Sequence, residues 1–225
     1  MKVELISWTK NPIETAARAA AVCYNSEPKE GILKSCYYSG HTSVLEHINF
    51  TFEISGVSRA LLAQLTRHRM ASYSVQSQRY VSMENNSFII PPSTQENEEI
   101  YRLVYDCERN AYSLLLENKV KKEDARMVLP NACETKLVMT LNLRSLSNLC
   151  GLRLCTRAQK EIRLMTQSMV NSVLLCEEIT QSFKDFLSKD VLVPKCEQGK
   201  LKYCSEGKGC CGRNKTAEEI MEAIK

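Results

Sequence analysis

The chain has 225 residues, of which 44% are hydrophobic and 25% charged, which is ordinary for a globular protein large enough to bury a sizeable core. Its formal net charge of +4 permits anionic ligands but falls short of the strong basic charge of a dedicated nucleic-acid-binding protein. Because the N-terminal "MKVELISWTKNP" lacks the apolar core of a signal peptide and no run reaches the ~18 apolar residues that span a bilayer, we expect a soluble, cytoplasmic protein without a nucleic-acid or membrane partner.

The first forty residues predict one strand and two helices. Residues 1–8 have the pattern of a strand, and Asn11 followed by Pro12 can open the Ala-rich helix that comes next. A second helix over about 29–39 is expected to end at Gly40, because glycine suits the left-handed conformation that stops a helix.

The clearest strand runs over residues 48–56, where apolar and polar side chains alternate. Apolar residues then recur at helical spacing over 57–69. This places an Arg-His-Arg cluster (67–69) at the C-terminal end of a helix, where the helix dipole favours cations. The rest of "RHRMASYSVQSQR" (67–79) alternates like a strand and ends on a further arginine.

The second half of the chain continues the mixture of strands and helices. A long polar-faced helix is expected over about 95–119, a strand over 134–142 and a helix over 144–154. Thr156 and Gln159 have the spacing of a capping box ahead of the last long helix. Since strands and helices do not alternate regularly, the pattern predicts an α+β fold around a mostly antiparallel sheet.

All three histidines lie in two short segments, "GHTSVLEH" (40–47) and the Arg-His-Arg cluster. Ser43 and Glu46 have capping-box spacing, so Glu46 is read as the cap of a short helix. His41 and His47 are six residues apart, which is the wrong interval for one helical face. We therefore expect no metal bound by these histidines.

Arginines recur further along the chain, at Arg126, Arg144 and Arg153. Arg144 and Asn148 share one helical face, whereas Arg153 is expected to point elsewhere or to follow the helix end. Guanidinium groups bind phosphates in a bidentate manner. With eight glycines and neither a dinucleotide fingerprint nor a P-loop, phosphates would be held by side chains. A solvated charged face is the alternative, which the apolar flanks of Arg126 and Arg153 disfavour.

Eleven cysteines fall into two groups. Seven are scattered among apolar neighbours and read as small buried hydrophobes in a reducing compartment: Cys23, Cys36, Cys107, Cys133, Cys150, Cys155 and Cys176. From Lys189 the composition shifts to Lys, Gly and Cys, and the other four follow: Cys196, Cys204, Cys210 and Cys211. Their spacing lacks the C-x2-C pairs of a zinc site, which favours a tail packed on the body or a redox-labile thiol cluster over a metal site.

Four ordered segments resemble one known family. "RHRMASYSVQSQR" is similar to the signature of flavin-dependent thymidylate synthases, and "GHTSVLEH", "ARMVLP" and "LNLRSLSNLCGLRLCTRAQKEIR" resemble its other conserved segments, from about residue 18 to 163. The resemblance implies FAD-dependent methylation of dUMP to dTMP, with methylenetetrahydrofolate as carbon donor, NADPH as reductant and no protein nucleophile. It also implies a twisted sheet flanked by helices, in a single synthase domain (1–190) followed by a Cys/Lys-rich extension (191–225). The family assembly is a homotetramer with shared active sites.

The same resemblance assigns site residues. The residues expected to bind FAD are Ser43, Arg67, His68, Arg69, Val75, Asn142, Leu143, Arg144 and Asn148. Those expected to bind dUMP are Gln64, Leu65, Thr66, Arg67, Val75, Gln76, Ser77, Gln78, Arg79, Arg126 and Arg153. Ser77 and Arg79 would face the phosphate, and Arg153 would be the catalytic residue that polarises the uracil ring.

Three positions depart from the family pattern. Many members carry an acidic residue at Val75, a histidine at Arg157 and a serine at Cys23. These departures keep open a relative that binds FAD but has lost catalysis. A nucleic-acid-binding module is a second alternative, but aromatic residues make up only 7% of the chain and are sparse among its cations. A role for Ser77 as a nucleophile is disfavoured against hydrogen bonding to an anion, because no histidine is nearby in the sequence.

Overall fold

Four antiparallel strands form the centre of the molecule. The computed structural model describes residues 1–29, 31–91, 93–200 and 202–224. In sheet order the strands are β1 (Lys2–Trp8), β2 (Asn49–Ser58), β4 (Glu134–Asn142) and β3 (Ala71–Val75). Every pairing in this sheet is antiparallel, so the α+β prediction is confirmed.

Strand β2 lies between β1 and β4 in the sheet. Its alternating pattern buries one face of the strand. Phe50, Phe52 and Ile54 are all within 1% of full burial, as the period-two pattern predicts. The register with β4 is interrupted at Gly56, which has a φ of 69° and lies against the backbone of Met1. Only glycine fits this left-handed, crowded position without strain.

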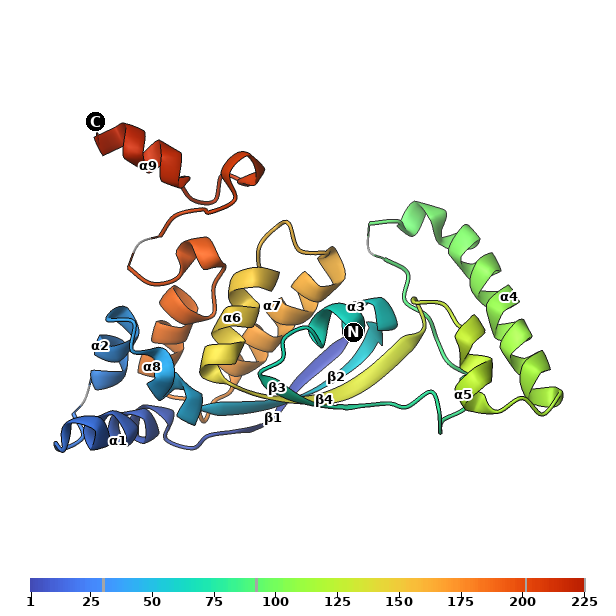
Figure 1. Ribbon diagram of the computed structural model, residues 1–225, viewed down its shortest axis with the longest axis horizontal. Coiled ribbons are helices and arrows are strands. Elements are labelled where there is room, and N and C mark those ends of the chain that lie inside the picture. The colour runs from blue at the N-terminus through green and yellow to red at the C-terminus, as the bar shows by residue number, and fades with distance from the viewer. Residues whose placement is uncertain (30, 92, 201, 225) are drawn as a thin grey trace.

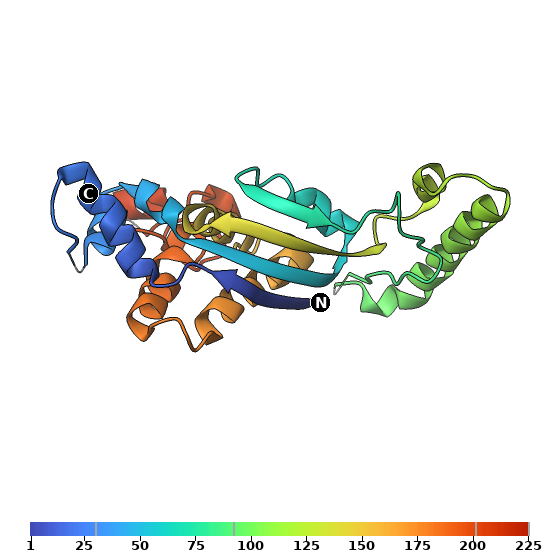
Figure 2. The ribbon, with the colours of Figure 1, turned by 90° about the horizontal axis from the view of Figure 1, so that it is seen from below.

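Helices cover one face of the sheet. The main layer consists of α6 (Leu143–Arg153), α7 (Lys160–Leu175), α3 (Arg59–Leu65) and α8 (Gln181–Phe186). Seen from below, the strands lie in front of α6 and α7 (Figure 2). Met165, Met169 and Val173 of α7 are fully buried against the sheet. Each such side chain contributes roughly 1.5–3 kcal/mol to folding.

Two further groups of helices extend the molecule at opposite ends (Figure 1). One end carries α1 (Pro12–Tyr24), α2 (Ile32–Tyr38) and the 3-10 helix η1 (Thr42–His47). The other end is an arm formed by α4 (Glu98–Glu117) and α5 (Lys122–Ala125). The arm has a small apolar cluster of its own, centred on Met83, Tyr112, Ala125 and Cys133. No helix in the described part of the chain is both long and apolar enough to span a bilayer.

The Arg-His-Arg cluster lies in a loop and not at a helix end, contrary to the prediction of a helix over 57–69. Helix α3 begins after Ser58, whose hydroxyl accepts from the Leu61 N–H (3.0 Å), and it ends at Leu65. The Tyr73 hydroxyl donates to the carbonyls of Leu65 (2.9 Å) and His68 (2.8 Å), so the chain turns into β3 there. A tertiary contact from the next strand thus overrides the helical pattern.

The helix caps were predicted less well than the helices. Asn11 precedes α1 in a left-handed conformation (φ 49°) and its side chain makes no cap. The predicted boxes at Ser43–Glu46 and Thr156–Gln159 are wrong, since neither helix start has a side-chain cap. Instead, Glu46 binds Arg144, and Gln159 binds Gln64. No local sequence pattern reveals these distant partners.

The helix predicted over 29–39 is shorter than expected. It begins at Ile32, and residue 30, inside the predicted range, lies outside the described residues. Gly40 has the expected left-handed conformation, with a φ of 82°. The long helix predicted over 95–119 begins as a 3-10 turn (Gln95–Asn97) and continues as α4.

The C-terminal extension folds back on α6. It contains the 3-10 turns Lys195–Glu197 and Gly207–Gly209 and the helix α9 (Ala217–Ile224). The Gln198 side chain donates to the Ser147 carbonyl of α6 (2.8 Å) and packs where a side chain at Gly151 would lie. This packing accounts for a glycine in the interior of α6, where it costs about 0.5–1 kcal/mol relative to alanine.

Candidate active site

A cavity of about 700 Å³ opens between the end of β4 and the exposed face of α6. Asn142 ends the strand and caps the helix, because its side-chain oxygen accepts from the Ser145 N–H (2.9 Å). Arg144, Asn148 and Leu152 follow at intervals of four residues and line the cavity. The volume lies in the range of sites for small molecules and cofactors.

Arg153 also lines this cavity, contrary to the expectation that it points away from Arg144. It is the last residue of α6, and its long side chain reaches back beside the helix end. The Arg153 Nε donates to Nε2 of His68 (3.0 Å) and its Nη2 to the Gln64 carbonyl (3.3 Å). These two acceptors, one on α3 and one in the loop after it, set the direction of the guanidinium. The position of Arg153 in the helical repeat of α6 does not.

The loop after α3 completes a strongly cationic lining. Arg67 and Arg69 flank His68 there, and Arg144 and Arg153 come from α6, against a single carboxylate, Glu46. Glu46 pairs with Arg144 at 2.5 Å, but both side chains are largely exposed, so the pair is weak. No ion pair is described for Arg67 or Arg69 in the part of the chain that the structure describes. Their guanidinium groups are therefore placed to bind an anion.

His68 is held in its neutral form by the surroundings. Burial, together with the charge of Arg153, lowers the pKa of His68 from 6.5 to about 4. Since a guanidinium only donates, the Nε2 of His68 is the acceptor and the Nδ1 carries the proton. Burial and the neighbouring Arg67 lower the pKa of Arg153 as well.

This arrangement predicts how stability depends on pH. Between pH 6.5 and about 4 the unfolded chain binds a proton at His68 that the folded chain refuses, so the free energy of unfolding should fall as the pH is lowered through this window. Urea unfolding of His68→Gln over the same window should show a shallower decline. His41→Gln, at an exposed histidine outside the cavity, serves as the control. Equal slopes for wild type and His68→Gln would contradict the assignment.

Two of the other predicted substrate residues, Arg79 and Arg126, contact Glu123 of α5. Arg79 Nε pairs with the Glu123 carboxylate at 2.5 Å, and Arg126 Nε donates to the Glu123 carbonyl at 3.0 Å. The Ser77 hydroxyl accepts from the Arg79 N–H (3.1 Å), which tightens this turn. The Gln78 side chain contacts the thiol of Cys133 (3.4 Å). The structure thus brings together Ser77, Arg79 and Arg126.

This second group lies at the opposite end of β3 from the cavity. Ala71, the first residue of β3, lines the cavity, whereas neither Arg79 nor Arg126 does. Val75, the last residue of β3, borders with Gln76 a separate hollow of about 310 Å³. Four residue steps along a strand span roughly 13 Å. In one chain the residues predicted to bind dUMP therefore form two groups.

The remaining predicted residues contribute differently. Leu65 and Leu143 are fully buried, and their backbones bind other parts of the chain: the Leu65 carbonyl accepts from the Tyr73 hydroxyl (2.9 Å), and the Leu143 N–H donates to the Ile48 carbonyl (2.7 Å). Ser43 is exposed on η1 beside the cavity lining but is not part of it, and the Thr66 hydroxyl is bound to the Leu62 carbonyl (3.0 Å). Val75 is half-buried against the core. A ligand role for each of these residues stays a prediction.

Comparisons with known proteins decide the family. The family model "Thymidylate synthase complementing protein" matches residues 4–175. A flavin-dependent thymidylate synthase of Clostridium tetani is 37% identical, over 98% of this chain and 96% of its own length. One of Pyrococcus abyssi is 36% identical, over 100% of this chain and 98% of its own length. This chain belongs to the flavin-dependent thymidylate synthase family.

A solved structure of a flavin-dependent thymidylate synthase agrees with this assignment. The enzyme of Helicobacter pylori, described as complexed with FAD and dUMP, has a TM-score of 0.66 and 27% identity to this chain. The match covers 82% of this chain and 97% of that chain. The family inferred from four sequence motifs is thus confirmed, and the fold with it.

Two polar residues of this thymidylate synthase were missed at the sequence level. Glu46 was read as a cap, although it lines the cavity. Arg59 is the first residue of α3, where the helix dipole disfavours a cation. Its Nη2 donates to the Gln76 carbonyl (2.7 Å), and its buried Nε has no described partner. An arginine near the start of a predicted helix is unfavourable, and this could have drawn attention to Arg59 in the sequence.

The cysteines form no disulfide in this member of the thymidylate synthase family. All eleven are free thiols. Among the described residues, no three histidine, cysteine, aspartate or glutamate side chains gather closely enough to hold a metal ion. Of the four C-terminal cysteines, Cys204 is buried (6% exposed), Cys196 and Cys210 are half-buried and Cys211 is exposed.

Proposed function

We propose that this chain catalyses the FAD-dependent methylation of dUMP to dTMP, with methylenetetrahydrofolate as carbon donor and NADPH as reductant, in de novo dTMP synthesis. The observation that carries the proposal is the arginine-lined cavity between β4 and α6. Its lining comes from the segments whose sequences resemble the family motifs. The relative from Helicobacter pylori, whose structure is described with FAD and dUMP, supports the same ligands here.

The chemistry of the cavity fits a flavin nucleotide. Arg67 and Arg69 suit its phosphates, Asn148 offers an amide, and Leu141 and Leu152 supply apolar surface for a ring system. Bound FAD supplies the redox chemistry and the relay of the one-carbon unit, so that no protein nucleophile is required. The side chains of this chain are left to bind, orient and polarise.

Arg153 has the most specific role in this proposal. Its guanidinium, fixed by His68 and the Gln64 carbonyl, is aimed at the uracil ring and stabilises negative charge that develops at N3. Because His68 is neutral at pH 7, it accepts from Arg153 and does not repel it. Preorganised donors of this kind need no rearrangement during the reaction.

We further propose that each active site is shared between copies of the chain in a homotetramer. A second copy would then bring Ser77, Arg79 and Arg126 to the phosphate of a dUMP bound near Arg153. The separation of the two groups along β3 within one chain supports this arrangement. The arm also exposes apolar residues of α4, among them Ile100 (63% exposed) and Leu103 (67%), which suit burial in an assembly.

The domain division is part of the same proposal. Residues 1–190 would form the synthase domain and 191–225 the Cys/Lys-rich extension. The family model ends at residue 175, but Phe183, Phe186 and Leu187 belong to the main core cluster, which supports a boundary near residue 190.

Tritium release from dUMP labelled at C5 tests the proposed reaction. Release is expected only when FAD, NADPH and methylenetetrahydrofolate are all present. A yellow protein that binds FAD without releasing tritium would instead be a flavin-binding relative that has lost the chemistry. A protein with neither flavin nor release would overturn the proposal.

A further inference from the structure

The C-terminal extension contacts the turn that follows Arg153. This turn, residues 154–159, joins α6 to α7. Arg157 Nη1 binds the Glu206 carboxylate at 2.7 Å, and Arg213 Nη1 lies 3.4 Å from the Leu154 carbonyl. Arg213 is itself paired with Glu197 at 3.3 Å. A segment far along the chain therefore binds the turn at Leu154 and at Arg157.

The middle of the turn is covered as well. The Cys211 thiol, at the surface, lies beside the Thr156 side chain, whose hydroxyl lowers the pKa of that thiol. The guanidinium of Arg157 lies directly over Gly209, where an added methyl group would overlap its Nη1. Residues 204–213, which we call the cover segment, thus contact three of the four residues that follow Arg153.

The same turn is also connected to Gln64, whose carbonyl accepts a hydrogen bond from Arg153. The side chains of Gln159, at the end of the turn, and Gln64, on α3, are hydrogen-bonded. The carbonyl of the same Gln64 accepts from Arg153 Nη2 (3.3 Å). A displacement of the turn would therefore act on Arg153 twice, through the end of α6 and through Gln64.

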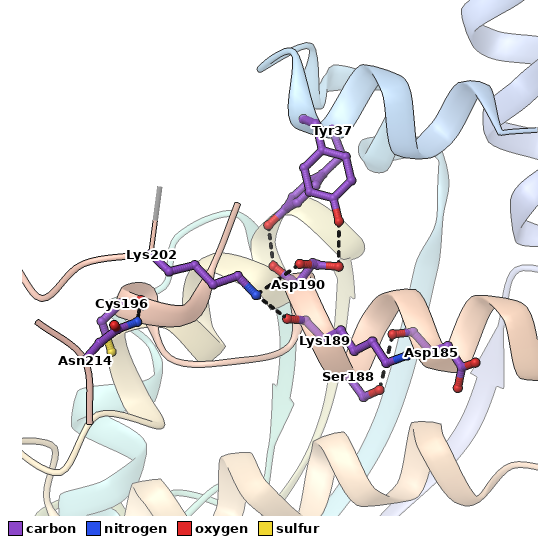
Figure 3. Close-up of polar contacts among 9 residues, drawn as sticks. Tyr37, Asp185, Ser188, Lys189, Asp190, Cys196, Lys202 and Asn214 are labelled. Carbon is purple, nitrogen blue, oxygen red and sulfur yellow. Dashed lines mark hydrogen bonds and ion pairs between the residues drawn. The ribbon is translucent and has the colours of Figure 1, made fainter. Parts of the chain in front are cut away.

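Residues before and after the cover segment are held by hydrogen bonds and an ion pair. Before it, Lys202 pairs with Asp190 (3.3 Å) (Figure 3). The Asp190 carboxylate also accepts from the Tyr38 hydroxyl (2.7 Å). After the cover segment, the Asn214 side chain donates to the Cys196 carbonyl (2.7 Å) (Figure 3). Asp190 has 16% of its side chain exposed and Lys202 has 41%, so this first contact is shielded from solvent on the Asp190 side only. The segment is thus held to the body on its N-terminal side, and on its C-terminal side to the 3-10 turn Lys195–Glu197 of the same extension.

We propose that the cover segment positions Arg153 for catalysis, with Glu206 as a positioning residue that acts through Arg157 and the turn. The inference rests on the proposed function, because Arg153 has its role only in that reaction. The sequence of contacts runs from Glu206 to Arg157, along the turn to Gln159, and to the Gln64 carbonyl. Neither Glu206 nor Arg157 lines the cavity of its own chain, and in this proposal each acts on Arg153 only through the turn.

Two variants of the full-length protein with bound FAD test this proposal by different means. Glu206→Gln removes the charge that holds Arg157, and Gly209→Ala displaces the Arg157 guanidinium without changing any charge. For each, kcat from tritium release should fall by about fivefold, the upper range for loss of an exposed ion pair. The KM for dUMP and the flavin content should stay at wild-type values, and the thermal midpoint should fall by no more than about 4 °C. Glu218→Gln, at an exposed glutamate of α9, is the matched control and should not change kcat.

A double-mutant cycle separates positioning from a general structural effect. In an Arg153→Ala background, Glu206→Gln should cause no further loss, because the residue through which it acts is absent. An equal loss in both backgrounds, or an unchanged kcat in both single variants, would overturn the inference while leaving the proposed function intact. A wild-type protein that releases no tritium would overturn both.

Discussion

Replacing Arg153 by alanine is expected to lower the rate of dTMP formation by about 10²–10³-fold, the range found when one preorganised donor is removed from an oxyanion-stabilising site. The variant deletes the group that stabilises charge on the uracil ring but leaves Arg67, Arg69 and Asn148 in the cavity. FAD should therefore stay bound. The measurement is tritium release from C5-labelled dUMP, with flavin content read from visible absorbance.

A matched control distinguishes this effect from a loss of positive charge. Arg18→Ala removes an exposed arginine of α1 that pairs with Glu14 and lies outside the cavity, and it should leave the rate unchanged. Arg153→Lys keeps the charge but loses the fork that binds both His68 and Gln64. We expect it to be nearer to alanine than to wild type. A wild-type rate in Arg153→Ala would contradict the catalytic role.

The elements that the sequence predicted well are those whose pattern is local. Strand β2 and strand β4 follow from the alternation of apolar side chains, and α6 from its helical spacing. Caps and helix ends were predicted poorly, because they are decided by distant partners. The end of α3 depends on a hydroxyl of the following strand, and Glu46 binds Arg144, 98 residues away, instead of capping η1.

The candidate site shows the same division. The family motifs identified the residues Arg67 to Arg69, Arg144, Asn148 and Arg153, which the fold then gathers in one cavity. The hydrogen bond between Arg153 and His68 joins residues 85 apart, so no spacing rule could predict it. The motifs also could not tell that residues 76–79 and Arg126 would lie at the other end of β3. That separation is a property of the sheet and raises the question of how one substrate meets both groups.

An active site shared between chains leads to a different prediction from an active site formed by a single chain. Arg153→Ala and Arg79→Ala should each be nearly inactive, the second because Arg79 is expected to bind the phosphate of dUMP by charge-assisted hydrogen bonds worth about 1.5–3 kcal/mol. When the two variants are unfolded together and refolded as mixed oligomers, some sites draw an intact Arg153 from one chain and an intact Arg79 from another. Random mixing makes about one site in four intact, so about a quarter of the wild-type rate should return.

The result of joint refolding depends on whether Arg153 of one chain and Arg79 of another chain bind the same dUMP molecule. If a single chain supplied both, every site in the mixture would carry one defect and the rate would stay at the average of the two variants. The control is the same pair refolded separately and combined afterwards, which should stay inactive while subunits do not exchange. Recovery only after joint refolding would therefore place Arg153 and Arg79 of different chains at one dUMP. It would also explain why β3 separates two groups of arginines that the chemistry requires together.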